Sequence, residues 1–169
     1  DGETVVQKVI LVDHNEVAQA APGIENAEVV EIIDHHRIAD VTTANPILFL
    51  NLPIGSTATI VTLQFRQTGI DLPDSIAMVL LSAILTDTVI MKSPTCTQVD
   101  IDQVKFLADK LGLDAVEFGM EIFRTRGGED KMPINKLVEA DSKEFKVNDD
   151  VTVLIAQRET VDLPTVMGR

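Results

Sequence analysis

The sequence lacks the features that mark secreted, disulfide-rich and membrane proteins. A single cysteine, Cys96, excludes an internal disulfide and fits a reducing compartment. The longest uninterrupted apolar run, Ile76 to Leu81, is far shorter than the roughly 20 residues that a membrane-spanning helix needs. The opening segment DGETVVQKVILVD has no basic stretch followed by an apolar core and a cleavage site, as a secretory signal would have. We therefore expect a cytoplasmic protein with no membrane segment.

Positive charge is also scarce. The chain has 14 Lys and Arg residues against 27 Asp and Glu residues, which gives a net charge of −13. Binding a phosphate backbone requires clustered Lys and Arg side chains that release counterions, and the sequence has no such cluster. We therefore expect no nucleic-acid partner. An acidic protein can instead hold metal ions, which can in turn bind a small polyanion, so the charge balance favours a metal enzyme.

The first part of the chain predicts parallel strands of an α/β domain. Residues 5–12 and 29–33 are β-branched runs typical of buried parallel strands, and residues 47–52 predict a third strand. The segment between the first two strands is long enough for a short crossover helix and a turn. This arrangement predicts a βαβ unit.

Helical spacing begins after residue 55. The segment GSTATIVTLQFRQTG opens with a cap signal at Ser56 and Thr57 and closes at Gly69, which predicts one helix. For these two hydroxyl residues we expect a helix-capping role and no other. A second helix is expected from Asp74, as its cap, to about Leu85. Two more helices are predicted at residues 97–111 and 115–123.

The pattern predicts two domains. Residues 1–123 are expected to form a parallel-sheet α/β domain, and residues 124–132, with two glycines and mixed charge, a linker. Residues 133–169 predict a short helix, a hairpin around residues 148–150 and a strand at 151–157. So short a segment cannot bury a core alone, so we expect it to be the start of a smaller α/β domain.

All three histidines follow an aspartate at the end of a predicted strand. His14 lies in LVDHNE, and His35 and His36 lie in IIDHHRIAD. Because ligands of an open α/β sheet bind outside the carboxyl ends of its strands, Asp13 and Asp34 with the neighbouring imidazoles are expected to project into one crevice. Carboxylate and imidazole ligands suit Mn²⁺, Co²⁺ or Fe²⁺. The alternative is that each Asp-His pair is only a strand-end turn, in which Asp caps a backbone amide.

Asp87 follows the apolar stretch IAMVLLSAIL. A carboxylate at the end of so apolar a helix is unfavourable to bury unless it finds a cation or hydrogen-bond donors. It is therefore a candidate metal ligand, and the alternative is a solvated residue at a helix end.

Five segments together resemble the manganese-dependent, or family II, inorganic pyrophosphatases of the DHH phosphoesterase superfamily. The resemblance covers nearly the whole chain. The DHH segment alone indicates only the superfamily, and the segments TDT, KSPT and DSKEF narrow it to the pyrophosphatases. In chain order the five segments are LVDHNE, IIDHHRIAD, PIGSTATIV, AILTDTVIMKSPTCTQVD and EADSKEF.

The resemblance implies a fold and a reaction. A DHH domain with a parallel sheet would be followed by the start of a domain of the DHHA2 type. The complete protein would hydrolyse pyrophosphate to two phosphates with a water activated by two metal ions, Mn²⁺ or Co²⁺, and with Mg²⁺ accompanying the substrate.

The resemblance also assigns roles to residues. Asp13 resembles the carboxylate that bridges the two metal ions, and His35 and Asp87 resemble ligands of one of them. His36 and Lys143 resemble the groups that bind the substrate phosphate, with His36 also assisting proton transfer. In this scheme Asp34 does not bind a metal ion itself, and its carboxylate orients an imidazole.

Two elements of the family are expected outside the chain. They are an HxDxD motif before residue 1, which supplies further metal ligands, and an Arg-Lys pair after residue 169. We therefore expect the isolated chain to be inactive. The family also includes homodimers and members with an adenine-nucleotide-binding CBS insert just before the LVDHNE strand.

Two other functions remain open at this point. A DHH phosphodiesterase acting on short oligonucleotides or cyclic dinucleotides would share the DHH segment, but it should carry a glycine-rich substrate motif that this sequence lacks. A catalytically inactive regulatory module is the second alternative. The intact candidate ligands at Asp13, His35 and Asp87 disfavour it.

Overall fold

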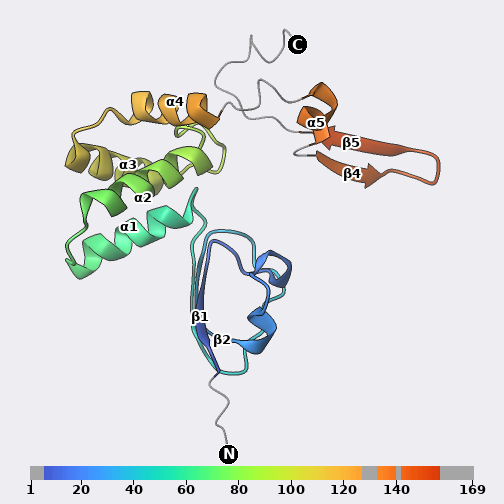
Figure 1. Ribbon diagram of the computed structural model, residues 1–169, viewed down its shortest axis with the longest axis horizontal. Helices are drawn as coiled ribbons and strands as arrows, with labels where there is room; N and C mark the ends of the chain where they lie inside the picture. Colours follow the sequence, from blue (N-terminus) through green and yellow to red (C-terminus); the bar gives the residue numbers. More distant parts are fainter. Residues whose placement is uncertain (1–5, 127–132, 140–141, 157–169) are drawn as a thin grey trace, which may run out of the picture. The chain divides into compact units, whose positions relative to one another are not determined.

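Two separate units make up the chain in the computed structural model, which describes residues 6–126, 133–139 and 142–156 (Figure 1). Unit 1 is Asp1–Ala115 and unit 2 is Val116–Arg169. In the described part of unit 1, a parallel sheet is followed by helices α1, α2 and α3. The predicted α/β class is confirmed.

The sheet of unit 1 consists of β1 (Lys8–Val12), β2 (Glu28–Asp34) and β3 (Leu48–Asn51), side by side in that order. Both strand pairs are parallel, as the β-branched runs predict. All three carboxyl ends therefore lie at one edge of the sheet. Asp13 and His35, which directly follow β1 and β2, share this edge.

The connection between β1 and β2 is not an α-helix. It contains two short 3₁₀ turns, Val17–Gln19 and Ile24–Asn26, so the prediction of a crossover helix is wrong. The sequence Pro22-Gly23 explains the break, because Pro lacks a backbone N–H and Gly23 adopts a left-handed φ of 97°. One turn of 3₁₀ helix on either side is all that the segment accommodates.

Three helices follow the sheet in unit 1: α1 (Thr57–Thr68), α2 (Asp74–Asp87) and α3 (Gln98–Leu111). The Ser56 side chain caps α1 by accepting a hydrogen bond from the backbone amide two residues on, and Gly69 closes the helix in a left-handed conformation. Both ends of α1 therefore agree with the cap signals in the sequence.

Two predicted boundaries are wrong. Pro73, and not Asp74, is the N-cap of α2, because Asp74 already has helical geometry and makes no side-chain cap bond. Helix α4 is Ala115–Arg126, so the first three residues of the predicted linker complete this helix. The rest of the predicted linker, residues 127–132, lies outside the described residues.

In the described part of the chain, no helix combines the length and the apolar character needed to cross a membrane.

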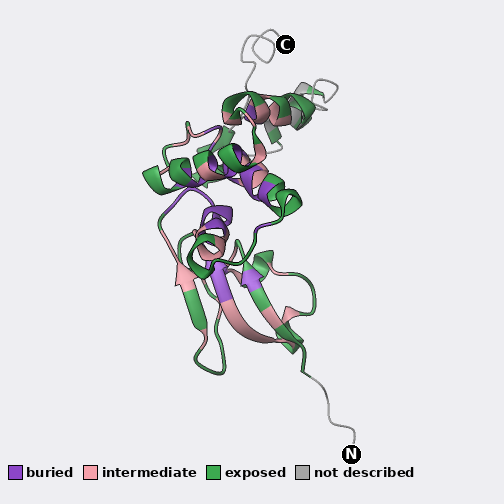
Figure 2. Ribbon diagram, turned by 90° about the vertical axis from the view of Figure 1, so that its left-hand side faces the viewer, coloured by how far each residue is buried: buried purple, intermediate pink, exposed green. Residues whose placement is uncertain are grey.

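The core of unit 1 lies where the carboxyl half of β2 meets the helices (Figure 2). The last three residues of β2 are buried, and so is the amino-terminal half of α1. Helices α2 and α3 each present an apolar face at the i, i+3 and i+4 spacing. Their fully buried side chains include Leu81, Ile84, Leu85, Val104 and Leu107.

Gly55, between β3 and α1, is a point of close approach. A Cβ atom at this position would lie 2.7 Å from Thr88 Cγ2 and 3.0 Å from Asp100 Oδ2. The first distance is shorter than real Cβ contacts and the second is unusually tight, and both neighbours are fully buried. The absence of a side chain at Gly55 thus allows the ends of α2 and α3 to reach this loop.

Unit 2 contains α4, a short helix α5 (Ile134–Glu139) and a hairpin of β4 (Ser142–Lys146) and β5 (Thr152–Ala156). The two strands are antiparallel, as the turn residues 148–150 predict. Every residue of the hairpin strands except Ser142 is exposed.

Replacing Gly55 by Ala is expected to lower the free energy of unfolding by about 1 to 3 kcal/mol, because the new methyl group overlaps Thr88 Cγ2. Chemical denaturation measures the loss. Removing the overlapping methyl group with Thr88→Ser should recover part of it in the double variant. If Gly55→Ala is as stable as the wild type, the close approach is not a constraint on the fold.

Candidate metal centre

Three side chains converge at the carboxyl edge of the sheet. Asp13 follows β1, and His35 and His36 follow β2. One ligand atom of each lies within 4.8 Å of the others, and among the described residues this is the one such group of carboxylate, imidazole or thiol side chains. The sequence predicts all three as site residues, but only Asp13 and His35 as metal ligands.

His35 is held by a backbone carbonyl. Its Nδ1 atom lies 2.9 Å from the Ile54 carbonyl oxygen, and its Nε2 atom lies 3.5 Å from Asp13 Oδ1. A hydrogen bond at one ring nitrogen fixes the tautomer and leaves the other nitrogen available as a ligand. Asp13 raises the pKa of His35 through its side-chain hydrogen bond and charge, although burial opposes the shift. The same contact holds the pKa of Asp13 below its ordinary value.

Asp34 does not project into the crevice, contrary to the expectation from the sequence. Its side chain is fully buried, and it accepts hydrogen bonds from the Asn15 amide and from the backbone amides of His35 and His36. The Nδ1 atom of His36 also lies 2.8 Å from Asp34 Oδ1. Burial works to raise the pKa of Asp34, but these hydrogen bonds outweigh it and hold the pKa low. The imidazole that this carboxylate orients is thus that of His36.

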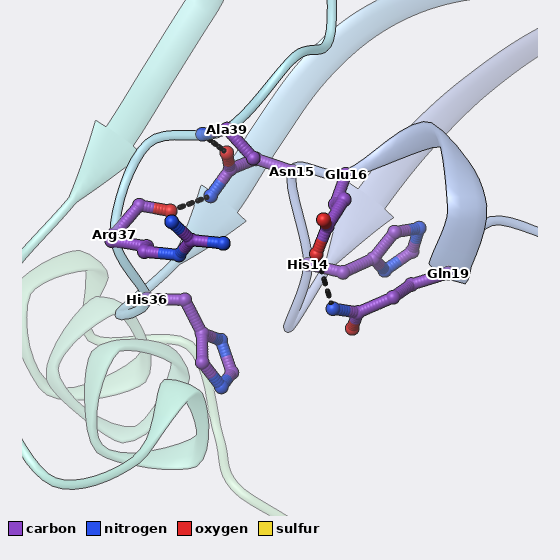
Figure 3. A pocket seen from close by; sticks show the side chains of 7 residues that line it. All are labelled: His14, Asn15, Glu16, Gln19, His36, Arg37 and Ala39. Carbon is purple, nitrogen blue, oxygen red and sulfur yellow. Dashed lines mark hydrogen bonds between the residues drawn. The ribbon is translucent and has the colours of Figure 1, made fainter. Parts of the chain in front are cut away.

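His14 does not join the other two histidines. Its Nδ1 atom bonds the Val12 carbonyl at 3.0 Å, and its ring lies beside Glu16 and Gln19 in a small pocket (Figure 3). His36 lies at another wall of this pocket. His14 therefore shares this pocket with His36 but is not among the three residues whose ligand atoms converge.

Asp87, the last residue of α2, lies close enough to the cluster to interact with it electrostatically. Its Oδ2 atom accepts a hydrogen bond from Ser56 Oγ at 2.6 Å. Burial of the carboxyl group raises the pKa of Asp87, and the negative charge of Asp13 adds to the increase, while Ser56 opposes it. Asp87 is nevertheless not one of the three residues whose ligand atoms lie within 4.8 Å.

Ser56 and Thr57 contribute more than a helix cap. Beside the Ser56 bond to Asp87, the buried Thr57 hydroxyl lies close enough to Asp13 to lower its pKa. These contacts were not predicted from the sequence. The signal for them was the position of two hydroxyl residues directly beyond a predicted strand, at the sheet edge where ligands bind.

The backbone has positive φ angles beside both acidic groups. Asp13 has a φ of 67°, and the residues after Asp87 include a left-handed run at Val89, Ile90 and Met91, with φ of 49°, 53° and 61°. Positive φ is unfavourable for β-branched residues and persists only where surrounding contacts enforce it. Here the enforcing contacts are two hydrogen bonds that span the run. The backbone amides of Lys92 and Ser93 both donate to the Thr88 carbonyl at 2.8 Å.

The residues of this site fit a divalent metal ion. The donor set combines carboxylate and imidazole, and each histidine of the cluster has its Nδ1 atom already bonded. Two neighbouring carboxylates repel each other, so a cation between them would be favourable. Within the described residues, the buried Thr57 hydroxyl near Asp13 makes no hydrogen bond of regular geometry and is a further polar group at this place.

Lys143, the other predicted site residue, lies in β4 of unit 2 and is exposed. It therefore belongs to a different unit from the cluster.

In the metal-free chain we expect His35 to titrate above pH 6.5, because its protonated form is stabilised by Asp13. Its contribution to stability is then present below about pH 6.5 and is lost as the pH rises through the raised pKa. Asp13→Asn should lower the pKa of His35, and Asp87→Asn should lower it less, because Asp13 dominates the shift. An NMR titration of the imidazole measures all three, and equal effects of the two variants would contradict the geometry.

Known proteins resemble the chain in sequence and in fold. Residues 3–84 match the N-terminal domain of the DHH family. A manganese-dependent inorganic pyrophosphatase of Bacillus subtilis is 41% identical over 97% of this chain and 53% of its own length. A cobalt-dependent inorganic pyrophosphatase of Clostridium perfringens is 44% identical over 95% of this chain and 29% of its own length.

A solved structure agrees with these relatives. A Methanococcus jannaschii protein assigned to the family II inorganic pyrophosphatases matches 97% of this chain and 58% of its own with a TM-score of 0.76, at 34% identity. The chain spans about half the length of most of the curated relatives that it matches. Residues 3–84 are therefore similar to the N-terminal domain of the DHH family, and the chain is similar, over nearly all of its length, to family II inorganic pyrophosphatases.

Proposed function

We propose that the complete protein hydrolyses inorganic pyrophosphate to two phosphates and that it uses Mn²⁺ or Co²⁺. The observation that carries this proposal is the convergence of Asp13, His35 and His36 at the carboxyl edge of the sheet. The names of the relatives support it, because they combine pyrophosphate as substrate with manganese or cobalt as metal.

In this proposal Asp13, His35 and Asp87 hold metal. Asp13 is suited to bridge two ions because its carboxylate is open to solvent, with 55% of its side chain exposed. His35 offers Nε2 while the Ile54 carbonyl holds its Nδ1. Asp87 keeps one oxygen on Ser56 and has the other available.

His36 is the proposed phosphate-binding and proton-transferring group. About half of its side chain is exposed, and Asp34 fixes its Nδ1 atom from behind. This arrangement fixes the tautomer and orientation of the imidazole and leaves the other ring nitrogen free to face outward. His36 can then donate a proton or a hydrogen bond to a phosphate oxygen.

Pyrophosphate hydrolysis requires charge neutralisation and a nucleophile at neutral pH. When bound, a pair of metal ions would supply both, and Mg²⁺ would accompany the substrate. Lys143, in unit 2, is proposed to add a compact positive charge. An ammonium group is well suited to this role because it binds phosphate as a point charge.

The first test is phosphate release from pyrophosphate by the complete protein in Mn²⁺ buffer. Asp13→Ala should lower kcat by more than about 100-fold. Loss of a metal ligand should have a larger effect than the 10- to 100-fold loss seen when a residue that only hydrogen-bonds to a ligand is removed. Asp71→Ala, which removes an exposed carboxylate elsewhere in unit 1, should leave the rate unchanged. Removal of the metal by a chelator should abolish turnover. Cleavage of a short dinucleotide with no release of phosphate from pyrophosphate would instead place the protein among the phosphodiesterases.

Lys143→Gln should lower kcat by about 10²- to 10³-fold, as loss of one charge-stabilising donor does in other enzymes. Lys146→Gln is the matched control, because this lysine lies three residues on in the same strand, on its other face, and pairs with Asp149. Steady-state kinetics of both variants decide the role. Equal activity of the two would remove Lys143 from the site.

A further inference from the structure

Asp100, near the start of α3, is a buried carboxylate with an unusually complete set of donors. Its side chain has no exposed surface. Oδ2 accepts from the Gly55 amide at 2.9 Å and from the Thr97 amide and hydroxyl at 2.8 and 2.7 Å, and Oδ1 accepts from Thr59 Oγ1 at 2.6 Å. Burial acts to raise the pKa of Asp100, but these donors outweigh it and keep the pKa low.

Only part of this set is explained by helix capping. Asp100 and Thr97 form a capping box at the start of α3, which accounts for the bonds to Thr97. The bonds to Gly55 and Thr59 are additional, and they reach 45 and 41 residues back along the chain. The first attaches α3 to the loop between β3 and α1, and the second attaches it to the first turn of α1.

That loop holds two of the proposed metal ligands. The Ile54 carbonyl accepts the hydrogen bond from His35 Nδ1, and Ser56 Oγ donates to Asp87. The Gly55 amide, which Asp100 holds, lies between these two contacts in the chain. A shift of Gly55 would therefore move the partners of both His35 and Asp87.

We propose that Asp100 is a positioning residue that fixes residues 54–56 and thereby sets the orientation of His35 and Asp87. The proposal rests on the proposed metal centre for its functional meaning. Asp100 itself touches neither ligand. It acts through the Gly55 amide, where the missing side chain leaves the space that its carboxylate fills.

Asp100→Asn is the sharpest variant, because the amide keeps the size of the side chain but removes its charge and one acceptor oxygen. In the wild type, His35 should carry its proton on Nδ1, facing the Ile54 carbonyl. In the variant, NMR of isotope-labelled histidine should show His35 shifting toward the Nε2-protonated tautomer. Mn²⁺ binding, measured by titration calorimetry, should weaken by about tenfold, which is the lower end of the effect of removing a residue that orients a metal ligand.

Gln103→Leu is the matched control. Gln103 is as fully buried as Asp100 and lies in the same helix, but its bonds go to Arg66 and Val99 and not to the loop. This variant should lower stability without changing the His35 tautomer or the affinity for Mn²⁺. A purely structural role of Asp100 predicts the same behaviour for both variants.

Thr59→Val provides a milder test if Asp100→Asn does not fold. It removes the bond to Oδ1 and should shift the His35 tautomer in the same direction by a smaller amount. An unchanged His35 tautomer in both folded variants, or in Thr59→Val alone where Asp100→Asn does not fold, would overturn the positioning role. If the wild type binds no Mn²⁺ while the tautomer still responds, the proposed metal centre fails and the positioning of His35 stands.

Discussion

A buried carboxylate at the end of β2 fixes the geometry on which the site depends. Asp34 has no exposed surface, so its charge is tolerable only because four donors surround it. Those donors come from the loops after both β1 and β2. Satisfying Asp34 therefore requires the two strand ends to lie together, and this requirement brings Asp13 within reach of His35.

The four aspartates of this region divide into two kinds according to their surroundings. Asp34 and Asp100 are fully buried and saturated with donors, so they act as fixed anchors of the backbone. Asp13 and Asp87 keep some open surface, and the pKa of Asp87 is raised by partial burial of its carboxyl group and by the charge of Asp13. Since the same carboxyl group serves in both kinds, its environment, and not its type, decides whether it can bind a cation.

The sequence could predict features that depend on local pattern. The ends of α1 follow from Ser56 and Gly69, and the shared edge of the sheet follows from two Asp-His pairs after β-branched runs. It could not predict contacts set by packing between distant segments, such as the bond from Gly55 to Asp100. Nor could it predict the left-handed run at residues 89–91, because neither glycine nor asparagine marks it.

The arrangement of anchors has a consequence for metal binding. In many small metal sites the ligands come together only when the ion binds, so part of the binding energy is used for folding. Here Asp34 and Asp100 hold the backbone on both sides of the cluster through contacts that involve no ion. His35 and His36 each already have one ring nitrogen fixed. A proton competes with the ion for His35, because Asp13 raises the pKa of this imidazole, whereas the repulsion between Asp13 and Asp87 favours a cation.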